Sequence, residues 1–331
     1  MLKFIHDLPE QCRDAYEIGN SSNINKPTIK INNIVFAGVG GSSIGADIIK
    51  VYLQDEIKIP VSICRNYTLP DFVGENTLLF CSSYSGDTEE TLSCFEQGLK
   101  RGAFIITMGA GGKLKELSLK NNIVHILIPP GYPPRAAIGY MSITILGVLV
   151  TLNFIKDKEN EVKELCSTLS GIRNKEIGFE VPLAKNISKQ IAIKLYKKYS
   201  IIYGTADITE AVSSRWREQI AEISKALSSS NILPEMNHNE IVGWRFPEKL
   251  LKDFKVIMLC DKDDNERIKE RVIISSNIIK KSKVEVLVLK RKSGGRLARI
   301  YSLMYIGDFV SFYLAIFNNI DPTPVEAINY L

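Results

Sequence analysis

The amino-acid sequence predicts an α/β protein with doubly wound parallel sheets flanked by helices, divided into two domains. The chain has 331 residues, more than a single domain of ordinary size contains. Its first half alternates strand-like runs with helical patterns, and its second half repeats the alternation less regularly. The strand-like runs are apolar throughout, which is typical of a parallel sheet that is covered on both faces.

The first half supplies the clearer elements. Strands are expected at Asn33–Val39, Ile59–Cys64, Thr77–Ser83, Ala103–Met108 and Ile123–Ile128. Helices are expected between them, at Ser43–Leu53, Thr88–Lys100 and Leu114–Lys120. This order of elements predicts a doubly wound domain.

The second half contains fewer distinct signals. Strands are expected at Ser200–Tyr203, Val256–Cys260 and Val284–Leu289, and helices at Ile208–Leu227, Asn265–Lys280 and Arg296–Phe317. A polar, charged stretch at Lys156–Phe179 is the expected place for the chain to pass between domains. We therefore expect domains at residues 1–155 and 156–331.

Composition narrows the class of protein. Hydrophobic residues make up 45% of the chain and charged residues 24%, and the formal net charge is only +5. This charge favours an anionic small molecule over a nucleic acid, which would call for a concentrated basic surface. The six cysteines are scattered without metal-ligand spacing, and Met1–Tyr16 has no apolar core of a secretion signal. We expect a cytoplasmic protein.

One stretch, residues 136–155, runs for twenty positions without a charge, about the length that spans a bilayer. Polar side chains are distributed along it, including Tyr140, Thr144 and Asn153. We expect a buried helix at a domain or subunit interface rather than a membrane span.

A glycine-rich loop, GVGGSSIG at Gly38–Gly45, follows the first expected strand. Such loops bring backbone N–H groups close to an anion at the start of a helix. A dinucleotide fingerprint is disfavoured because Ser43 replaces its third glycine, and because the second strand ends in Cys64-Arg65 rather than in a ribose-binding acid. We expect no nucleotide cofactor, although Arg65 keeps a 2′-phosphate conceivable.

A hydroxyl-rich segment, SSYSGDTEET at Ser82–Thr91, follows the third expected strand. Ser83, Ser85 and Thr88 offer hydroxyls at the start of a helix, an arrangement that suits a phosphate group without a metal. The alternative is an ordinary N-cap with nothing bound.

The two loops together resemble the sugar isomerase (SIS) domain, with Gly40-Gly41-Ser42 after the first strand and Ser-x-Ser-Gly-x-Thr after the third. Four further blocks resemble the bifunctional phosphoglucose/phosphomannose isomerase family. They are PPRAAIGYM at Pro133–Met141, RWREQIAEISKA at Arg215–Ala226, PEMNHNEIVGW at Pro234–Trp244 and DPTPVEAI at Asp321–Ile328. The resemblance covers nearly the whole chain and implies two SIS domains per subunit and a homodimer with shared active sites.

The resemblance also implies a role for particular residues in the isomerisation of glucose 6-phosphate and mannose 6-phosphate to fructose 6-phosphate. Glu222 would move the proton between C1 and C2 through a cis-enediolate, and Arg135 would stabilise the enediolate oxygens. His238, reaching the site from the neighbouring subunit, would open the sugar ring. The residues expected to bind the substrate are Gly40, Gly41, Ser42, Ser83, Ser85 and Thr88.

The family pattern includes a lysine shortly after the DPTPVEAI block, and here the last lysine is Lys292. This difference is consistent with one alternative, a regulatory, non-catalytic SIS protein that binds a sugar phosphate. An isomerase of another sugar phosphate is the other alternative. A zinc-dependent isomerase is disfavoured because the chain has three dispersed histidines. We expect a reaction without metal.

Overall fold

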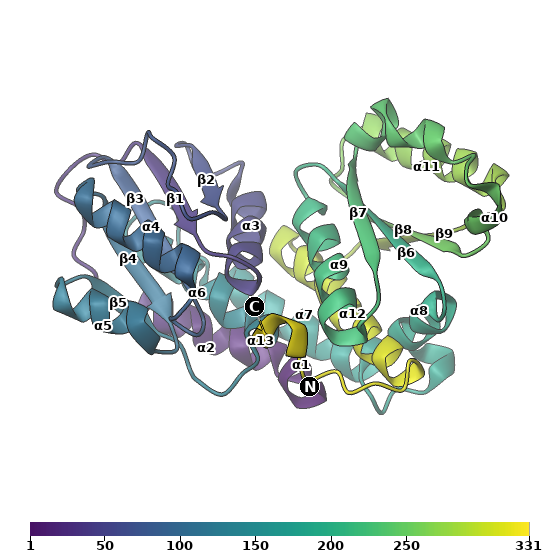
Figure 1. Cartoon of the computed structure of the whole chain (residues 1–331), viewed down its shortest axis with the longest axis horizontal. Coiled ribbons are helices and arrows are strands. Elements are labelled where there is room, and N and C mark those ends of the chain that lie inside the picture. The colour runs from purple at the N-terminus through teal and green to yellow at the C-terminus, as the bar shows by residue number, and fades with distance from the viewer. Residues whose placement is uncertain (331) are drawn as a thin grey trace. The chain divides into compact units, whose positions relative to one another are not determined.

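The computed structural model describes residues 1–330 and divides the chain into two compact units (Figure 1). One, here called the N-terminal unit, comprises Asp7–Cys166; the other, the C-terminal unit, comprises Met1–His6 and Ser167–Leu331. The expected α/β class with parallel sheets flanked by helices is confirmed in both units.

The division lies later in the chain than the expected boundary after residue 155. The segment that follows residue 155 packs on the N-terminal unit, where the hydroxyl of Tyr16 donates a 2.8 Å hydrogen bond to Asp157 and Lys158 pairs with Glu56 at 2.7 Å. The chain does pass from one unit to the other within the expected stretch, Lys156–Phe179, and it does so inside helix α7 (Glu159–Ile172).

The sheet of the N-terminal unit has the order β2-β1-β3-β4-β5, and its strands are all parallel. The strands are β1 (Asn33–Ala37), β2 (Val61–Cys64), β3 (Thr77–Ser82), β4 (Phe104–Gly109) and β5 (Val124–Leu127). The helices are α2 (Leu8–Asn20), α3 (Gly41–Leu53), α4 (Glu89–Lys100), α5 (Gly112–Lys120), the 3₁₀ turn η1 (Pro134–Ala136) and α6 (Ile138–Thr151). Each expected strand of this half is present.

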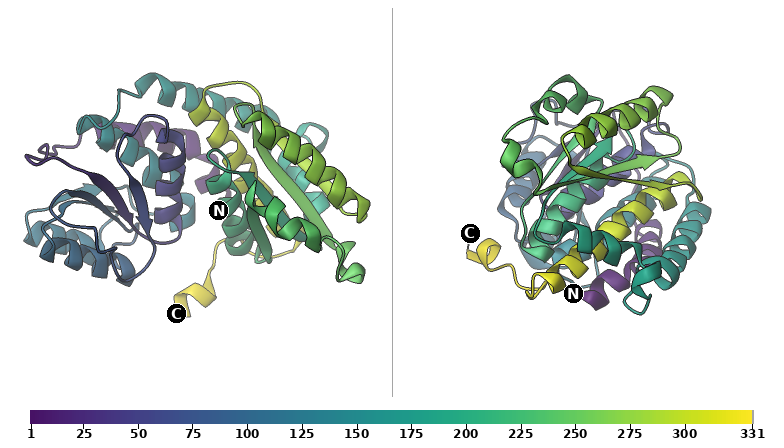
Figure 2. Two further views of the ribbon diagram at one scale, coloured as in Figure 1. Left: turned by 90° about the horizontal axis from the view of Figure 1, so that it is seen from above. Right: turned by 90° about the vertical axis from the view of Figure 1, so that its right-hand side faces the viewer.

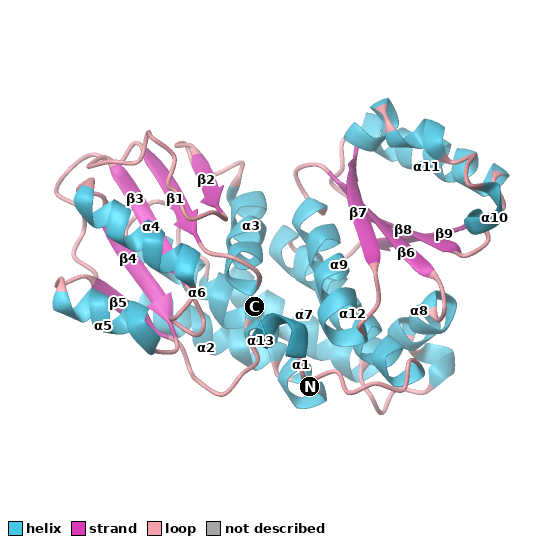
Figure 3. Cartoon of the chain, viewed as in Figure 1, coloured by secondary structure: helices cyan, strands magenta, loops and turns pink. Residues whose placement is uncertain are grey.

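Helices cover both faces of this sheet (Figure 3). Phe95 of α4 and Leu114 of α5 pack on the face that presents Val35, Leu79 and Ile105. Helices α3 and α6 cover the other face, with α2 against α6. Burial on both faces explains why the strands are apolar throughout.

Helix α6 is buried, as expected, but it does not provide a subunit interface. Its side chains from Ile138 to Leu149 are all buried, and much of the cover comes from α2 and α3 of the same unit. The approach to α2 is close, because a Cβ on Gly19 would lie 2.3 Å from the carbonyl oxygen of Thr144. The uncharged run therefore belongs to the core of its own unit and offers no large apolar surface to a second subunit.

The sheet of the C-terminal unit has the order β7-β6-β8-β9 and is also parallel. Its strands are β6 (Tyr199–Thr205), β7 (Ser228–Leu233), β8 (Phe254–Asp261) and β9 (Glu285–Arg291). The α-helices are α1 (Leu2–His6), α8 (Ile187–Leu195), α9 (Glu210–Ser224), α10 (Glu248–Leu251), α11 (Glu266–Lys281), α12 (Arg296–Phe317) and α13 (Glu326–Tyr330). Short turns of π or 3₁₀ helix are η2 (Arg173–Ile177), η3 (Leu183–Lys185), η4 (Glu235–His238) and η5 (Glu240–Gly243).

In this unit α11 lies on one face of the sheet and α12 lies on the other (Figure 2, right), where α12 packs against α8 and α9. Among the described residues, α12 is the helix long and apolar enough to cross a membrane, but 89% of its apolar window is buried within the protein. A buried charge pair also joins it to α9, since Asp308 of α12 accepts hydrogen bonds from Arg215 of α9 at 2.9 and 3.1 Å. These observations identify α12 as a core helix.

Candidate functional site

The two motifs of the N-terminal unit meet at the carboxyl ends of two neighbouring strands of its sheet. Strands β1 and β3 are parallel neighbours, and their following connections lead to opposite sides, to β2 and to β4. A Cβ built on Gly38, after β1, would lie 2.7 Å from the carbonyl oxygen of Ser82 at the end of β3. The motifs therefore flank the point where the strand order reverses, which is where doubly wound proteins bind ligands.

The hydroxyls after β3 form a connected group. The Oγ of Ser83 lies 2.8 Å from Oγ1 of Thr88 and 3.4 Å from Oγ of Ser85, and it accepts a 3.0 Å hydrogen bond from the N–H of Gly86. Ser83 is buried, Thr88 is half-buried and Ser85 is exposed, so the group leads from the interior to the surface. We call these three residues, together with Ser42 from the first turn of α3, the hydroxyl cradle.

Thr88 occupies the N-cap position of α4, but in the described chain no side chain caps this helix. The hydroxyl of Thr88 contacts Ser83 instead of the first-turn N–H groups. The start of α4 thus keeps backbone donors and the positive end of the helix dipole for an anion. The ordinary N-cap that the sequence left open is not the arrangement in the structure.

A second glycine loop, after β4, supports the cradle. Gly86 has φ +83°, and a Cβ on it would lie 1.9 Å from the carbonyl oxygen of Gly111. The carboxylate of Asp87 accepts a 2.9 Å hydrogen bond from the N–H of Lys113. Sequence reasoning missed this support, although the Gly111-Gly112 pair after a strand was a usable signal.

The turn that carries Arg135 lies against the glycine loop. A Cβ on Gly41 would lie 3.0 Å from the carbonyl oxygen of Pro134 and 3.8 Å from the Cα of Arg135. Arg135 is only 5% exposed. The structure therefore brings Gly41 and Arg135 together from segments that are far apart in the sequence.

Tyr84 attaches the same segment to the cradle loop. Its hydroxyl donates a 2.9 Å hydrogen bond to the carbonyl oxygen of Pro129 and accepts one of 2.9 Å from the N–H of Tyr132. Burial raises the pKa of the Tyr84 phenol, which keeps it neutral and able to donate. The Arg135 turn is therefore fixed both to the loop after β1 and to the loop after β3.

Arg65, which the sequence left as a candidate for a 2′-phosphate, has protein partners. Its guanidinium pairs with Asp47 on α3 and donates a 3.3 Å hydrogen bond from Nε to the Oγ of Ser43. Burial raises the pKa of Asp47, and the neighbouring Arg65 opposes this rise. Arg65 thus orders the first turn of α3, beside Ser42.

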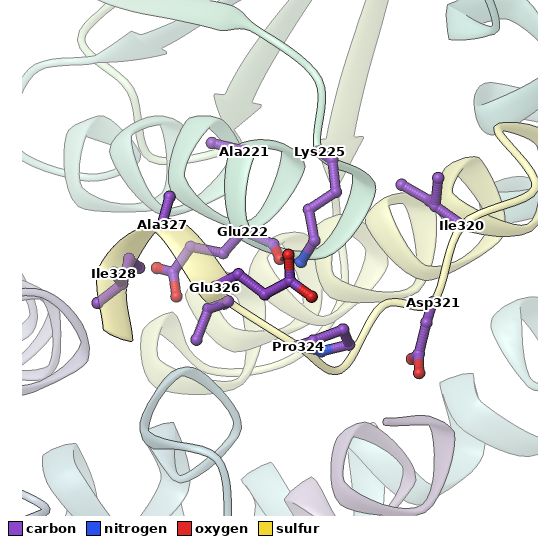
Figure 4. A pocket seen from close by; sticks show the side chains of 10 residues that line it. Ala221, Glu222, Lys225, Ile320, Asp321, Pro324, Glu326, Ala327 and Ile328 are labelled. Carbon is purple, nitrogen blue, oxygen red and sulfur yellow. Dashed lines mark hydrogen bonds between the residues drawn. The ribbon is translucent and has the colours of Figure 1, made fainter. Parts of the chain in front are cut away.

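Glu222 lines a cavity of about 530 Å³ in the C-terminal unit. Figure 4 shows Glu222 and Lys225 from the end of α9 facing Glu326 of the C-terminal segment. The other lining residues are Ala221, Ile320, Asp321, Pro324, Val325, Ala327 and Ile328. The cavity therefore joins the block that carries Glu222 to the DPTPVEAI block, about a hundred residues later in the sequence.

Two neighbours of Glu222 were not singled out from the sequence. The ammonium group of Lys225 donates a hydrogen bond to the carbonyl oxygen of Glu222, and Lys225 itself has φ +51° at the end of α9. Glu218, one turn earlier, pairs with Arg217 at 3.1 Å. Burial raises the pKa of Glu218, and Arg217 opposes this rise.

His238 ends the 3₁₀ turn η4, which follows β7, and its side chain is exposed. The residues on either side of it are fixed. Asn237 donates a 2.6 Å hydrogen bond to Ser275 of α11, and Asn239 donates one of 2.7 Å to Glu235.

Within one C-terminal unit, Glu222 and His238 lie at opposite ends of the sheet. Helix α9 connects the carboxyl end of β6 to the amino end of its parallel neighbour β7, so Glu222 lies near the amino ends of the strands. His238 follows the carboxyl end of β7. A strand of this length spans about 17–20 Å. The structure does not bring these two residues together within this unit.

Among residues 1–330, no group of three or more His, Cys, Asp or Glu side chains is arranged to hold a metal ion. The metal-free reaction stays a prediction.

Comparison with known proteins shows that the chain is similar to phosphoglucose and phosphomannose isomerases. Residues 184–331 match the family model described as the bacterial phospho-glucose isomerase C-terminal SIS domain. The whole chain is 42% identical to a bifunctional phosphoglucose/phosphomannose isomerase of Caldicellulosiruptor bescii and covers 97% of it. A bifunctional phosphoglucose/phosphomannose isomerase of Thermoplasma acidophilum is 33% identical over 91% of this chain and 88% of its own.

A solved structure shares the fold at lower sequence identity. The C-terminal domain of glucosamine-fructose-6-phosphate aminotransferase from Francisella tularensis aligns with a TM-score of 0.73 and 14% identity, over 97% of both chains. This likeness shows that the two proteins share the same fold over nearly the whole chain.

Proposed function

The chain belongs to the bifunctional phosphoglucose/phosphomannose isomerase family, and on this basis we propose that it interconverts glucose 6-phosphate or mannose 6-phosphate with fructose 6-phosphate. One observation carries the proposal. Both SIS motifs and the Arg135 turn lie together at the carboxyl ends of β1 and β3, where the strand order of the sheet reverses. The reaction moves a proton between C1 and C2 through a cis-enediolate.

The hydroxyl cradle would hold the 6-phosphate. Its hydroxyls and the first-turn N–H groups of α4 are donors that need no metal, and the helix dipole favours a dianion there. Binding energy from this remote group would orient the reacting carbons.

Glu222 would serve as the base that carries the proton between C1 and C2. It lines a cavity large enough for part of a sugar and lies at the end of a well-packed helix, so its backbone is fixed. Arg135 would stabilise the enediolate oxygens, since arginine stays charged and presents a planar set of donors. Its burial and its contact with Gly41 limit the positions open to its side chain.

His238 would open the sugar ring in the active site of a second subunit. The separation of Glu222 and His238 across the β7 strand supports this, because the two residues cannot serve one ring from the same C-terminal unit. Exposed apolar side chains lie on the segment that follows His238 and on α11, which contacts that segment: Val242 and Phe246 are each 77% exposed and Ile274 is 57% exposed. We therefore propose a homodimer whose contact includes this surface rather than α6.

We further propose that the protein works in the cytoplasm. The six cysteines are free thiols and five of them are buried, as suits a reducing compartment.

The proposal is tested by coupled assays that offer glucose 6-phosphate, mannose 6-phosphate and fructose 6-phosphate in turn, with EDTA present throughout. We expect turnover of all three. Loss of activity in EDTA that zinc restores would contradict the metal-free mechanism. Binding of all three sugars without turnover would favour the regulatory alternative, and turnover of a different sugar phosphate alone would favour the other isomerase.

A further inference from the structure

Glu240 holds the segment that carries His238 to the sheet. Its Oε1 accepts a hydrogen bond from the hydroxyl of Tyr203, and its Oε2 accepts one of 2.6 Å from Nδ2 of Asn231. Both carboxylate oxygens are therefore engaged. A bond to a charged acceptor is roughly twice as strong as one between neutral groups.

The two donors are themselves neighbours in the sheet. Tyr203 on β6 and Asn231 on β7 are register partners, so their side chains project from the same face. Tyr203 is fully buried and packs in the core with Met236 and Trp244, whose Nε1 donates a 3.2 Å hydrogen bond to the Tyr203 hydroxyl. Burial and the nearby Glu240 raise the pKa of Tyr203, which keeps it a donor. Glu240 is thus attached to a rigid part of the fold.

Further hydrogen bonds connect Glu240 to the residues on either side of His238. The N–H of Glu240 donates a 2.6 Å hydrogen bond to Oδ1 of Asn239, whose Nδ2 bonds to Glu235 at the start of η4. His238 lies between these fixed points and its own side chain is exposed. The backbone that carries the imidazole is therefore held in place by the anchoring of its neighbours.

We propose that Glu240 is a positioning residue that fixes His238 for ring opening through Tyr203 and Asn231. This inference rests on the role proposed for His238. Glu240 itself need not touch the sugar.

The kinetic test uses Glu240→Gln. The amide replaces one carboxylate oxygen by an NH2 group, so one of the two atoms that now accept from Tyr203 and Asn231 becomes a donor. We expect kcat for glucose 6-phosphate to fall roughly 10- to 100-fold, as for a small misplacement of a reacting group, while KM changes by less than about threefold. The matched control is Glu248→Gln, which removes the same charge from an exposed position on α10, outside the hydrogen bonds that hold the His238 segment, and which should keep kcat within about threefold.

A double-mutant cycle separates positioning from general support of the fold. In a His238→Ala background, Glu240→Gln should cause little further loss, because residues that act as a unit are strongly non-additive. An equal loss of kcat in both backgrounds would overturn the inference, as would a Glu240→Gln enzyme with wild-type kcat.

A third measurement does not depend on activity, so failure of the proposed function can be distinguished from failure of the inference. The chain has three histidines, and the His238→Ala variant assigns the imidazole signals of His238 in NMR spectra. We expect Glu240→Gln to shift or broaden those signals and Glu248→Gln to change them less. Unchanged His238 signals in Glu240→Gln would overturn the inference even if the wild type proved to be no isomerase.

Discussion

The side-chain oxygens of Ser83 and Thr88 lie 2.8 Å apart across the turn between β3 and α4. This contact takes the Thr88 hydroxyl away from the helix that it would otherwise cap. The relationship matters for function, because it leaves the start of α4 with unpaired donors beside a set of hydroxyls. An anion bound between the hydroxyls and the start of α4 would accept hydrogen bonds from both.

Removal of the cradle hydroxyls is expected to weaken substrate binding. In Ser85→Ala and Thr88→Ala, each lost hydrogen bond to the phosphate should cost about 1.5–3 kcal/mol of binding free energy. Inorganic phosphate should inhibit the wild type competitively and the variants less. The control is Ser93→Ala, further along α4, whose hydroxyl donates instead to the carbonyl oxygen of Tyr67 at 2.8 Å. Normal binding by both cradle variants would place the phosphate elsewhere.

Gly86→Ala is expected to disrupt the hydroxyl cradle by displacing the glycine loop after β4 that supports it. The new Cβ would meet the carbonyl oxygen of Gly111 at 1.9 Å, and the positive φ of +83° adds strain. We expect a lower Tm and loss of phosphate inhibition. Gly74→Ala serves as the control in the same unit, because a Cβ there meets its nearest atom, the carbonyl oxygen of Arg101, at 3.9 Å. Equal effects of the two substitutions would show that the close approach at Gly86 is unimportant.

Glu222→Gln is expected to abolish isomerisation while phosphate binding remains. Glutamine keeps the shape of the side chain but cannot accept the proton, and general-base catalysis is typically worth ~100- to 10,000-fold in rate. The measurement is kcat, together with inhibition by inorganic phosphate. Glu218→Gln, one helical turn away, removes the same charge from the same helix and should retain most of the activity. A Glu222→Gln enzyme with most of its kcat would reduce Glu222 to a surface residue.

Mixed dimers test the shared site directly. One inactive partner would carry Glu222→Gln and the other His238→Ala, so that after subunit exchange each mixed dimer contains one site with both residues intact. Random pairing places about half of the subunits in mixed dimers, so activity should recover to about a quarter of the wild-type value per site.

The control for this experiment pairs Glu222→Gln with a chain that carries both substitutions, because no intact site can form there. If subunit exchange is verified and no activity returns, His238 acts in its own subunit and the shared-site proposal fails.

Local sequence was sufficient for the strands and loops of the N-terminal unit, because buried parallel strands are apolar at every position and glycines and hydroxyls mark the loops after them. It was insufficient for β7. That strand, SSSNIL, lies at the sheet edge and is polar, so it lacks the pattern of a buried strand.

The sequence by itself determined the fold class, the two phosphate-loop motifs and the family blocks, since each depends on residues that are close along the chain. Only the tertiary structure placed Arg135 against Gly41 and the C-terminal segment against Glu222. It alone assigned the uncharged helix α6 to the core of its own unit. It alone separated Glu222 from His238 across a strand, because the direction of the crossover helix decides which end of the sheet a residue reaches. The physical reason is common to all four: packing joins segments that no local pattern connects.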